Sequence, residues 1–290
     1  MLVHIKELFA NKEQVVGKFA YPAFNTNNLE TTIGIIAAAE ELNTPVIIET
    51  SEGAIKYAGL ETLYEIMASL AMKASVPIAL HMDHGQDMDQ LRRGIELGYS
   101  SAMIDHSHLT MEENIRDTKA MVEFAHKHGA WVQGEIGRIG GKEDWQEVKD
   151  DEVFLTTPEE AADFYEATKV DTLAGAFGTI HGIIKMNGTV EAKVDVERIS
   201  QVAQAVPVPL VLHGGSGVPE DVVRKAIEAG ITIVNTDTEL RLAFTQGLRQ
   251  ALAENPDEVD PRKYLSPAIE ALKQAAMIKL KMLKTQNVIQ

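Results

Sequence analysis

The sequence predicts an α/β protein, a closed (β/α)8 TIM barrel with an additional C-terminal helix. Its length of 290 residues suits one large barrel domain. Short apolar runs alternate along the chain with helix-length amphipathic segments. Several runs are apolar without interruption, as in Val46-Ile47-Ile48 and Leu210-Val211-Leu212. Uninterrupted apolar runs are typical of parallel strands that are covered on both faces.

Eight runs are predicted to be strands: 19–25, 45–50, 77–82, 101–104, 131–135, 172–174, 209–213 and 232–235. Helix-length segments fill the gaps, among them 29–42, 112–128 and 219–229. Alternation of strand and helix implies a parallel sheet with right-handed crossovers, and eight repeats favour closure into a barrel. The alternative is an open doubly wound sheet, but no Gly-x-Gly-x-x-Gly motif follows the first run.

Two segments depart from the repeat. The polar stretch 137–152 follows the fifth strand and contains Gly140-Gly141 as a candidate hinge, which predicts a mobile lid. A helix over about 267–283 is expected to pack on a partner subunit or to cap the barrel. The predicted organisation is therefore one TIM-barrel domain over 1–290, with a mobile loop at about 137–152 and a C-terminal extension at about 256–290.

Composition limits the classes of function. The absence of cysteine excludes disulfides and thiolate metal sites. The first residues lack the apolar run of a signal peptide, and no stretch reaches the roughly 20 apolar residues of a membrane span, so we expect a cytoplasmic protein without membrane contact. The net charge of −16 disfavours nucleic acid as a partner. It also repels phosphorylated metabolites, so a phosphate site would need local positive groups.

Three of the nine histidines, His84, His181 and His213, follow the third, sixth and seventh predicted strands. Barrel enzymes build their active sites at the carboxyl ends of the strands. Three imidazoles there can hold one divalent cation with an open fourth position, which is the catalytic arrangement of zinc. Three other histidines are interpreted as ordinary surface or packed residues: His4, His126 and His128.

Acidic residues follow the same rule. Asp83 precedes His84, Asp105 ends the fourth strand, and Glu135 ends the fifth. Each alone would be a helix cap or a solvated acid, but together they predict an acidic, histidine-rich mouth in which carboxylates serve as ligands, orienting groups or general bases. Strand alternation puts Asp83 and His84 on opposite faces, so the chain must turn there. The pattern alone leaves open whether His81 or His84 faces the metal.

Two loops have the features of a phosphate site. The seventh strand runs into Gly214-Gly215-Ser216-Gly217, and the eighth into Asn235-Thr236-Asp237-Thr238, each followed by a helix. Glycine lets backbone amides approach an anion, and helix amino ends add partial positive charge. The loops after strands seven and eight are the usual phosphate site of such barrels. Lys185 is a candidate counter-charge.

Motifs spread along nearly the whole chain carry a resemblance to one enzyme family. They are Ala23-Phe24-Asn25-x-Asn27-Asn28-Leu29-Glu30, Ser51-Glu52-Gly53, His81-Met82-Asp83-His84-Gly85, Met103-Ile104-Asp105-x-Ser107-His108, Gly134-Glu135-Ile136-Gly137, Gly140-Gly141-x-Glu143-Asp144, Gly178-x-x-His181-Gly182, Leu212-His213-Gly214-Gly215-Ser216-Gly217, Asn235-Thr236-Asp237-Thr238 and Asp260-Pro261-Arg262-x-Tyr264. Together they resemble the class II, metal-dependent fructose-bisphosphate aldolases and the closely similar tagatose-bisphosphate aldolases.

The resemblance implies roles around the metal. The ligands of a catalytic zinc are matched by His84, His181 and His213, and acids near a second divalent metal by Glu135 and Asp105. Asp83 matches the acid/base that handles the substrate hydroxyl at the bond being cleaved. On the loop, Glu143 matches the residue that moves the proton of the three-carbon half, with Asp144 as the alternative.

The resemblance also implies how substrate is held. The pocket for one phosphate is matched by Gly182, Lys185, Gly214, Gly215, Ser216, Asp237 and Thr238, and other substrate contacts by Asn25, Ser51 and Asn235. Arg241 and Arg262 match residues that hold the other phosphate. In the family, the counterpart of Arg262 comes from the neighbouring subunit, which implies a homodimer or homotetramer. A monovalent cation, Na⁺ or K⁺, near the phosphate loop is a further family feature.

The expected reaction is reversible cleavage of fructose 1,6-bisphosphate to dihydroxyacetone phosphate and glyceraldehyde 3-phosphate through a zinc-stabilised enediolate, rather than through a lysine Schiff base. Tagatose 1,6-bisphosphate, which differs at one carbon, is the nearest alternative, and Asp237 and Arg241 favour fructose over it. A metal-dependent hydrolase would carry His-x-His at the first strand, where this chain has Phe24-Asn25-Thr26. A sugar-phosphate-binding protein without catalysis would lack Asp83 or one of the histidines.

Overall fold

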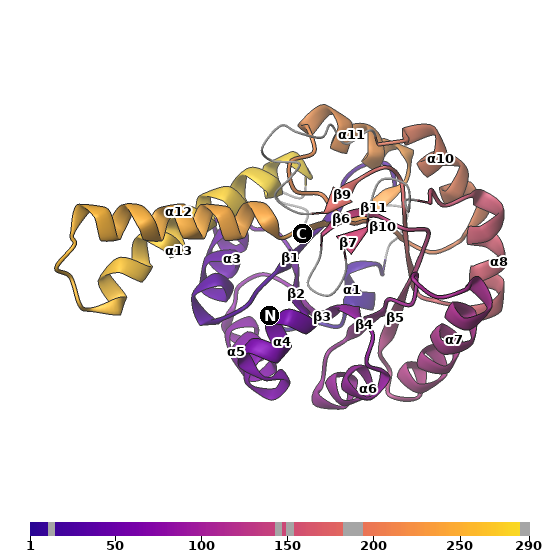
Figure 1. Cartoon of the computed structure of the whole chain (residues 1–290), viewed down its shortest axis with the longest axis horizontal. Helices are drawn as coiled ribbons and strands as arrows, with labels where there is room; N and C mark the ends of the chain where they lie inside the picture. The colour runs from indigo at the N-terminus through magenta and orange to yellow at the C-terminus, as the bar shows by residue number, and fades with distance from the viewer. Residues whose placement is uncertain (11–14, 143–146, 149–153, 182–193, 285–290) are drawn as a thin grey trace.

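The protein is a closed barrel of eight parallel strands surrounded by helices (Figure 1). The computed structural model describes residues 1–10, 15–142, 147–148, 154–181 and 194–284, and for 141–142, 147–148 and 180–181 it describes the backbone alone. Around the barrel the strand order is β1-β11-β10-β8-β5-β4-β3-β2. The barrel strands are β1 (Tyr21–Asn25), β2 (Val46–Ser51), β3 (Ile78–Gly85), β4 (Ser101–Ile104), β5 (Trp131–Ile136), β8 (Thr172–Gly175), β10 (Leu210–Leu212) and β11 (Ile231–Thr236).

The helices of the described chain occupy the predicted gaps and begin at recognisable caps. They are α1 (Ile5–Leu8), α3 (Leu29–Glu41), α4 (Glu52–Ala58), α5 (Leu60–Lys73), α6 (Met88–Leu97), α7 (Met111–Lys127), α8 (Pro158–Thr168), α10 (Val196–Ala205), α11 (Glu220–Ala229), α12 (Thr238–Glu254) and α13 (Pro261–Met282). Capping boxes at Asn28, Thr110 and Thr157 satisfy the first backbone amides of α3, α7 and α8. These local signals explain why each helix starts close to the end of the preceding strand.

Two apolar clusters hold the barrel together. The larger one fills the space between the strands and the surrounding helices. The smaller one lies inside the barrel, where side chains such as Tyr21, Ile47 and Ile233 meet Ile5 and Leu8 of α1. The short helix α1 therefore closes the amino-terminal end of the barrel with apolar contacts. Polar side chains of the strands gather at the opposite, carboxyl-terminal end.

All eight predicted barrel strands are confirmed, but a small additional sheet was missed. Its strands are β6 (Gly140–Lys142), β7 (Glu147–Val148) and β9 (Ile180–His181), in the order β7-β6-β9. His181 therefore does not follow the sixth barrel strand directly, because β8 ends at Gly175 and His181 lies in β9. The backbone of His181 is in register with Gly141, so the predicted lid segment and the third histidine share one sheet.

The C-terminal helix is longer than predicted. It begins at Pro261, six residues before the predicted start at 267, because Asp260 caps it and proline is well tolerated at the first helical position. Pro267 lies inside the helix instead of beginning it. α12 and α13 pack against each other as an arm that extends from the barrel (Figure 1). None of the helices in the described ranges is both long and apolar enough to span a membrane.

Candidate metal and substrate site

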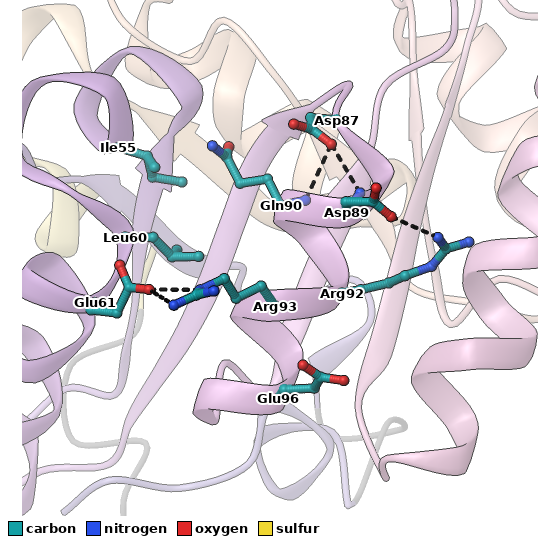
Figure 2. Close-up of a pocket in the computed structure, with 9 residues that line it drawn as sticks. All are labelled: Ile55, Leu60, Glu61, Asp87, Asp89, Gln90, Arg92, Arg93 and Glu96. Carbon is teal, nitrogen blue, oxygen red and sulfur yellow. Dashed lines mark hydrogen bonds and ion pairs between the residues drawn. The ribbon is translucent and has the colours of Figure 1, made fainter.

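One surface pocket of about 570 Å³ lies outside the barrel, between α4, α5 and α6 (Figure 2). Its charged side chains are largely satisfied within the pocket: Arg93 pairs with Glu61 and Arg92 with Asp89. The pocket contains none of the predicted site residues. The chemistry predicted from the sequence lies instead at the carboxyl end of the barrel strands.

Strand β3 carries two site candidates on consecutive residues, Asp83 and His84, and both side chains are buried. The pairing between β3 and β4 shifts register between Met82 and Gly85, and His84 has a φ of 48°, in the left-handed region. Holding a residue other than glycine there costs about 1–2 kcal/mol, and such strain clusters at functional sites. This irregularity is the turn that the sequence required, and it brings His84 Nε2 to 3.9 Å from Asp83 Oδ1.

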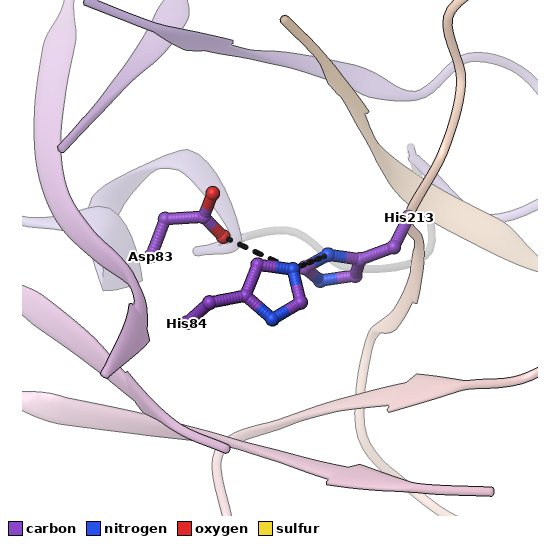
Figure 3. Close-up of side chains that lie close together, drawn as sticks. All are labelled: Asp83, His84 and His213. Atoms are coloured by element: carbon purple, nitrogen blue, oxygen red, sulfur yellow. Dashed lines mark hydrogen bonds and ion pairs between the residues drawn. The ribbon is translucent and has the colours of Figure 1, made fainter. Parts of the chain in front are cut away.

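His84 and His213 meet inside the barrel mouth (Figure 3). His84 Nε2 lies 2.8 Å from His213 Nδ1, and the two rings are nearly perpendicular, at 78°. Asp105 Oδ2 accepts a hydrogen bond from His84 Nδ1 at 2.8 Å. Because an ionised carboxylate can only accept, the proton of His84 resides on Nδ1, and the lone pair of Nε2 points at His213.

The Asp105 carboxyl is fully buried beneath His84. Burial by itself would raise the pKa of Asp105, but hydrogen bonds from His84 and Ser107 outweigh it and hold the pKa below its ordinary value. Asp105 therefore remains ionised and available as an acceptor for the His84 ring. Carboxylate–histidine pairs of this kind orient the ring of a metal ligand.

The described side chains fit a divalent metal ion. Three buried groups each bring ligand atoms within 4.8 Å of one another: Asp83 with His84 and His213, His84 with Asp105 and Glu135, and Glu49 with His81 and Asp83. Two nitrogens bound to one tetrahedral zinc lie about 3.3 Å apart, so the two rings would part by only about 0.5 Å. Because the donors are imidazole nitrogens and carboxylate oxygens, they suit zinc and similar borderline cations.

Asp83 is held by two amide side chains from other strands. Asn25 Nδ2 donates to Asp83 Oδ2 at 2.7 Å, and Asn235 Nδ2 donates to Asp83 Oδ1 at 3.4 Å. Asn235 Nδ2 also donates to Glu49 Oε2 at 3.0 Å. Asn235 Oδ1 is buried and has no hydrogen-bond partner within the described ranges. Among the residues that the structure describes, an acceptor beside Asp83 is thus left without a donor.

His81 lies on β3, three residues before His84. Its Nδ1 is 2.8 Å from Ser101 Oγ, and it belongs to the group with Glu49 and Asp83. Complete burial, followed by the effect of His84, lowers the pKa of His81 to about 3, so the ring is neutral. Both His81 and His84 thus belong to metal-competent groups, and the choice of His84 rests on the family resemblance and on its contact with His213.

Two buried residues at this site, Glu49 and Gln133, were not predicted from the sequence. Gln133 Nε2 lies 2.8 Å from His213 Nε2, and Glu49 holds the amide of Asn235. Both interrupt otherwise apolar strands, as in Val46-Ile47-Ile48-Glu49. A polar residue on a strand covered on both faces must find a partner inside the barrel, and this signal could have identified them.

The glycine-rich loop after β10 lies against the loop after β11. Gly215 N donates to Asn235 O at 3.0 Å, and a Cβ added to Gly215 would lie 2.5 Å from that oxygen. Only glycine allows this approach. Glu239 accepts from Gly217 N at 3.0 Å and pairs with the buried Lys279 at 2.6 Å, which ties the loop to α12 and α13.

The remaining predicted residues are placed as follows. Ser51 caps α4, Thr238 is buried at the start of α12, and Arg241 pairs with Asp237 at 2.5 Å. Arg262 pairs with Asp260 at the start of α13, at the end of the arm far from the barrel, so this chain does not bring it to the site (Figure 1). Three predicted residues lie outside the described residues: Glu143, Gly182 and Lys185, and so does the alternative acid Asp144. The side chain of His181 is also outside them.

Comparison with known proteins identifies the family of the chain. Residues 3–288 match the family of class II fructose-bisphosphate aldolases. The chain is 44% identical over 281 residues to a fructose-bisphosphate aldolase of Thermus caldophilus, covering 90% of this chain and 91% of that protein.

Solved structures have the same architecture. The YdjI aldolase from Escherichia coli K12 has a TM-score of 0.83 and 35% identity, covering 99% of each chain. A putative fructose-1,6-bisphosphate aldolase from Coccidioides immitis has a TM-score of 0.83 and 33% identity, covering 97% of this chain and 95% of that one. The chain therefore belongs to the class II, metal-dependent fructose-bisphosphate aldolase family.

Proposed function

We propose that this aldolase reversibly cleaves fructose 1,6-bisphosphate to dihydroxyacetone phosphate and glyceraldehyde 3-phosphate. The observation that carries the proposal is the buried pair His84 Nε2–His213 Nδ1, 2.8 Å apart and beside Asp83. The glycine-rich loop that follows His213 lies against the loop after β11. This arrangement combines a metal site, an acid/base and a candidate phosphate site at one barrel mouth.

The metal is proposed to be zinc, held by His84 and His213 with His181 as the third ligand. When bound, such an ion supplies Lewis-acid polarisation of the carbonyl and adjacent hydroxyl oxygens of the ketose. Asp105 orients the His84 ring through the hydrogen bond to Nδ1. Glu135 and Asp105, which group with His84, are the candidates for a second divalent position.

Asp83 is proposed to take the proton from the hydroxyl on the fourth carbon. Loss of that proton lets the bond between the third and fourth carbons break. The aldehyde leaves, and the electron pair of the broken bond stays on the third carbon. The amides of Asn25 and Asn235 fix the carboxylate for this task. Glu143, or alternatively Asp144, then returns a proton to the third carbon. Condensation follows the same steps in reverse.

The rest of the substrate is assigned from the resemblance. One phosphate is proposed to bind where the glycine-rich loop after β10 meets the loop after β11, with Gly182 and Lys185 completing the pocket and Na⁺ or K⁺ nearby. Ser51 is proposed as a further substrate contact. The other phosphate is assigned to Arg241 and to Arg262 of a neighbouring subunit, in a homodimer or homotetramer. The position of Arg262 at the far end of the arm supports a role in another copy rather than in its own site.

The test compares purified enzyme on fructose and tagatose 1,6-bisphosphates, before and after complete metal removal and after return of zinc. We expect cleavage of fructose bisphosphate to be faster, to vanish with the metal and to return with zinc. Faster turnover of tagatose bisphosphate would replace the proposed substrate by its epimer. Activity that survives metal removal, with a lysine adduct trapped by borohydride, would contradict the metal route.

A further inference from the structure

Gln133 projects from β5 into the barrel and contacts one of the two central histidines. Its side chain is buried, with 2% of the residue exposed. Its Nε2 lies 2.8 Å from His213 Nε2 and 3.1 Å from Met103 Sδ. The amide therefore uses both of its hydrogens, one on the ring nitrogen of His213 that faces away from His84.

These contacts form a chain of hydrogen bonds with a single direction. Gln133 donates to His213 Nε2, so the proton of a neutral His213 lies on Nδ1. His213 Nδ1 then donates to His84 Nε2 at 2.8 Å, and His84 Nδ1 donates to Asp105. Each buried nitrogen in the chain has a complementary partner. In this tautomer, His213 has no lone pair on Nδ1 for a metal.

Metal binding requires the opposite tautomer of His213. A ligand nitrogen must be deprotonated, so Nδ1 must lose its proton and the neutral ring must carry it on Nε2. The buried Nε2–H then needs an acceptor, because an unsatisfied donor costs about 1–3 kcal/mol. Gln133 can supply one by turning its amide so that Oε1 replaces Nε2. This rotation of the amide gives up only the weak hydrogen bond from Gln133 Nε2 to Met103 Sδ.

We propose that Gln133 is a positioning residue whose amide reverses on metal binding, donating to His213 Nε2 in the metal-free enzyme and accepting from Nε2–H in the metal-bound enzyme. The inference rests on the proposed metal site at His84 and His213. A neutral amide suits this task because it offers a donor and an acceptor at nearly the same place. A carboxylate would offer only the acceptor, and an aliphatic side chain neither.

The test reads the tautomer of His213 directly, by ¹⁵N NMR of histidine-labelled enzyme with and without zinc, assigned by comparison with His213→Gln. We expect the proton on Nδ1 in the metal-free enzyme and on Nε2 in the zinc form. In Gln133→Glu, which keeps only the acceptor, we expect Nε2–H already in the metal-free enzyme. The same variant should bind zinc about 10-fold more tightly at alkaline pH, measured by chelator competition. In Gln133→Leu, we expect the proton of metal-free His213 to stay on Nδ1, because His84 Nε2 still accepts from it.

The outcomes separate this inference from the proposed function. If the wild-type enzyme binds zinc at His213 but its Nε2 is protonated in both states, the reversal of Gln133 is wrong while the metal site stands. Weaker zinc binding by Gln133→Glu, or a metal-free tautomer unchanged from that of the wild type, would also overturn it. If the resonances of His84 and His213 do not respond to zinc at all, both the inference and the proposed metal site fail.

Discussion

Replacing Asp105 by asparagine should weaken metal binding at His84. The substitution keeps the shape of the side chain and one acceptor oxygen but removes the charge. In the native protein, the ionised carboxylate accepts from His84 Nδ1 at 2.8 Å in a buried setting. That bond fixes the tautomer of His84 and raises the basicity of Nε2, the atom that faces His213.

The magnitude follows from the type of hydrogen bond. Bonds to charged groups contribute about 1.5–3 kcal/mol and neutral ones about 1 kcal/mol, so exchanging carboxylate for amide forfeits about 1–2 kcal/mol. Because 1.4 kcal/mol corresponds to a tenfold change, Asp105→Asn should bind zinc about 5- to 30-fold more weakly. The assay is competition with a chromophoric chelator, which gives affinity and the number of ions per chain.

Asp117→Asn is the matched control. Asp117 Oδ2 accepts from His106 Nδ1 at 2.9 Å, so the same kind of pair is altered away from the three metal-competent groups. Its zinc affinity should equal that of the wild type. An unchanged affinity in Asp105→Asn, or an equal loss in the control, would refute the orienting role of Asp105. Loss of a whole ion per chain would instead make Asp105 a ligand of a second metal.

Three further predictions follow from named contacts. Asp83→Asn should lower kcat about 10²- to 10⁴-fold while zinc affinity stays within about twofold, because Asp83 is proposed to move a proton and not to hold the metal. A comparable loss of zinc affinity would contradict this role. Gly215→Ala should raise KM for the bisphosphate with little change in zinc content, because the added Cβ would lie 2.5 Å from Asn235 O and force the loops after β10 and β11 apart. An unchanged KM would show that this loop does not form the phosphate site. Burial lowers the pKa of His4 below 6.5, so neutral His4 stabilises the fold above pH 6.5 and this stability is lost as the pH falls. Protonation of Nδ1 would break the hydrogen bond that it accepts from Lys6 N. His4→Gln should therefore flatten the fall in thermal unfolding temperature between pH 7 and 5.

The barrel could be predicted because its strands are short runs of apolar residues without alternation. Such runs reflect burial on both faces, which is a property of each strand and its immediate cover. The small sheet β7-β6-β9 was missed because its strands are two or three residues long and include Gly140-Gly141. Their pairing depends on two loops that meet only after the barrel has closed.

Part of the candidate site could be predicted because it follows from the positions of the barrel strands. Placement at strand ends indicated His84 and His213, but the register shift that turns His84 inward depends on pairing with β4, which periodicity does not show. α13 begins six residues before the predicted start at 267, because Asp260 caps it and Pro261 is tolerated in its first turn. Glu49 and Gln133 were passed over because a single polar residue in an apolar run does not reveal its partner on another strand.

The central claim is that His84 and His213 bind one catalytic metal through the nitrogens that face each other. The most direct measurement is anomalous X-ray diffraction at the zinc edge from crystals of the zinc-loaded enzyme. We expect a peak about 2.0–2.1 Å from both His84 Nε2 and His213 Nδ1, with His181 as the third nitrogen ligand. Zinc found only at the group of Glu49, His81 and Asp83, or at neither group, would contradict it.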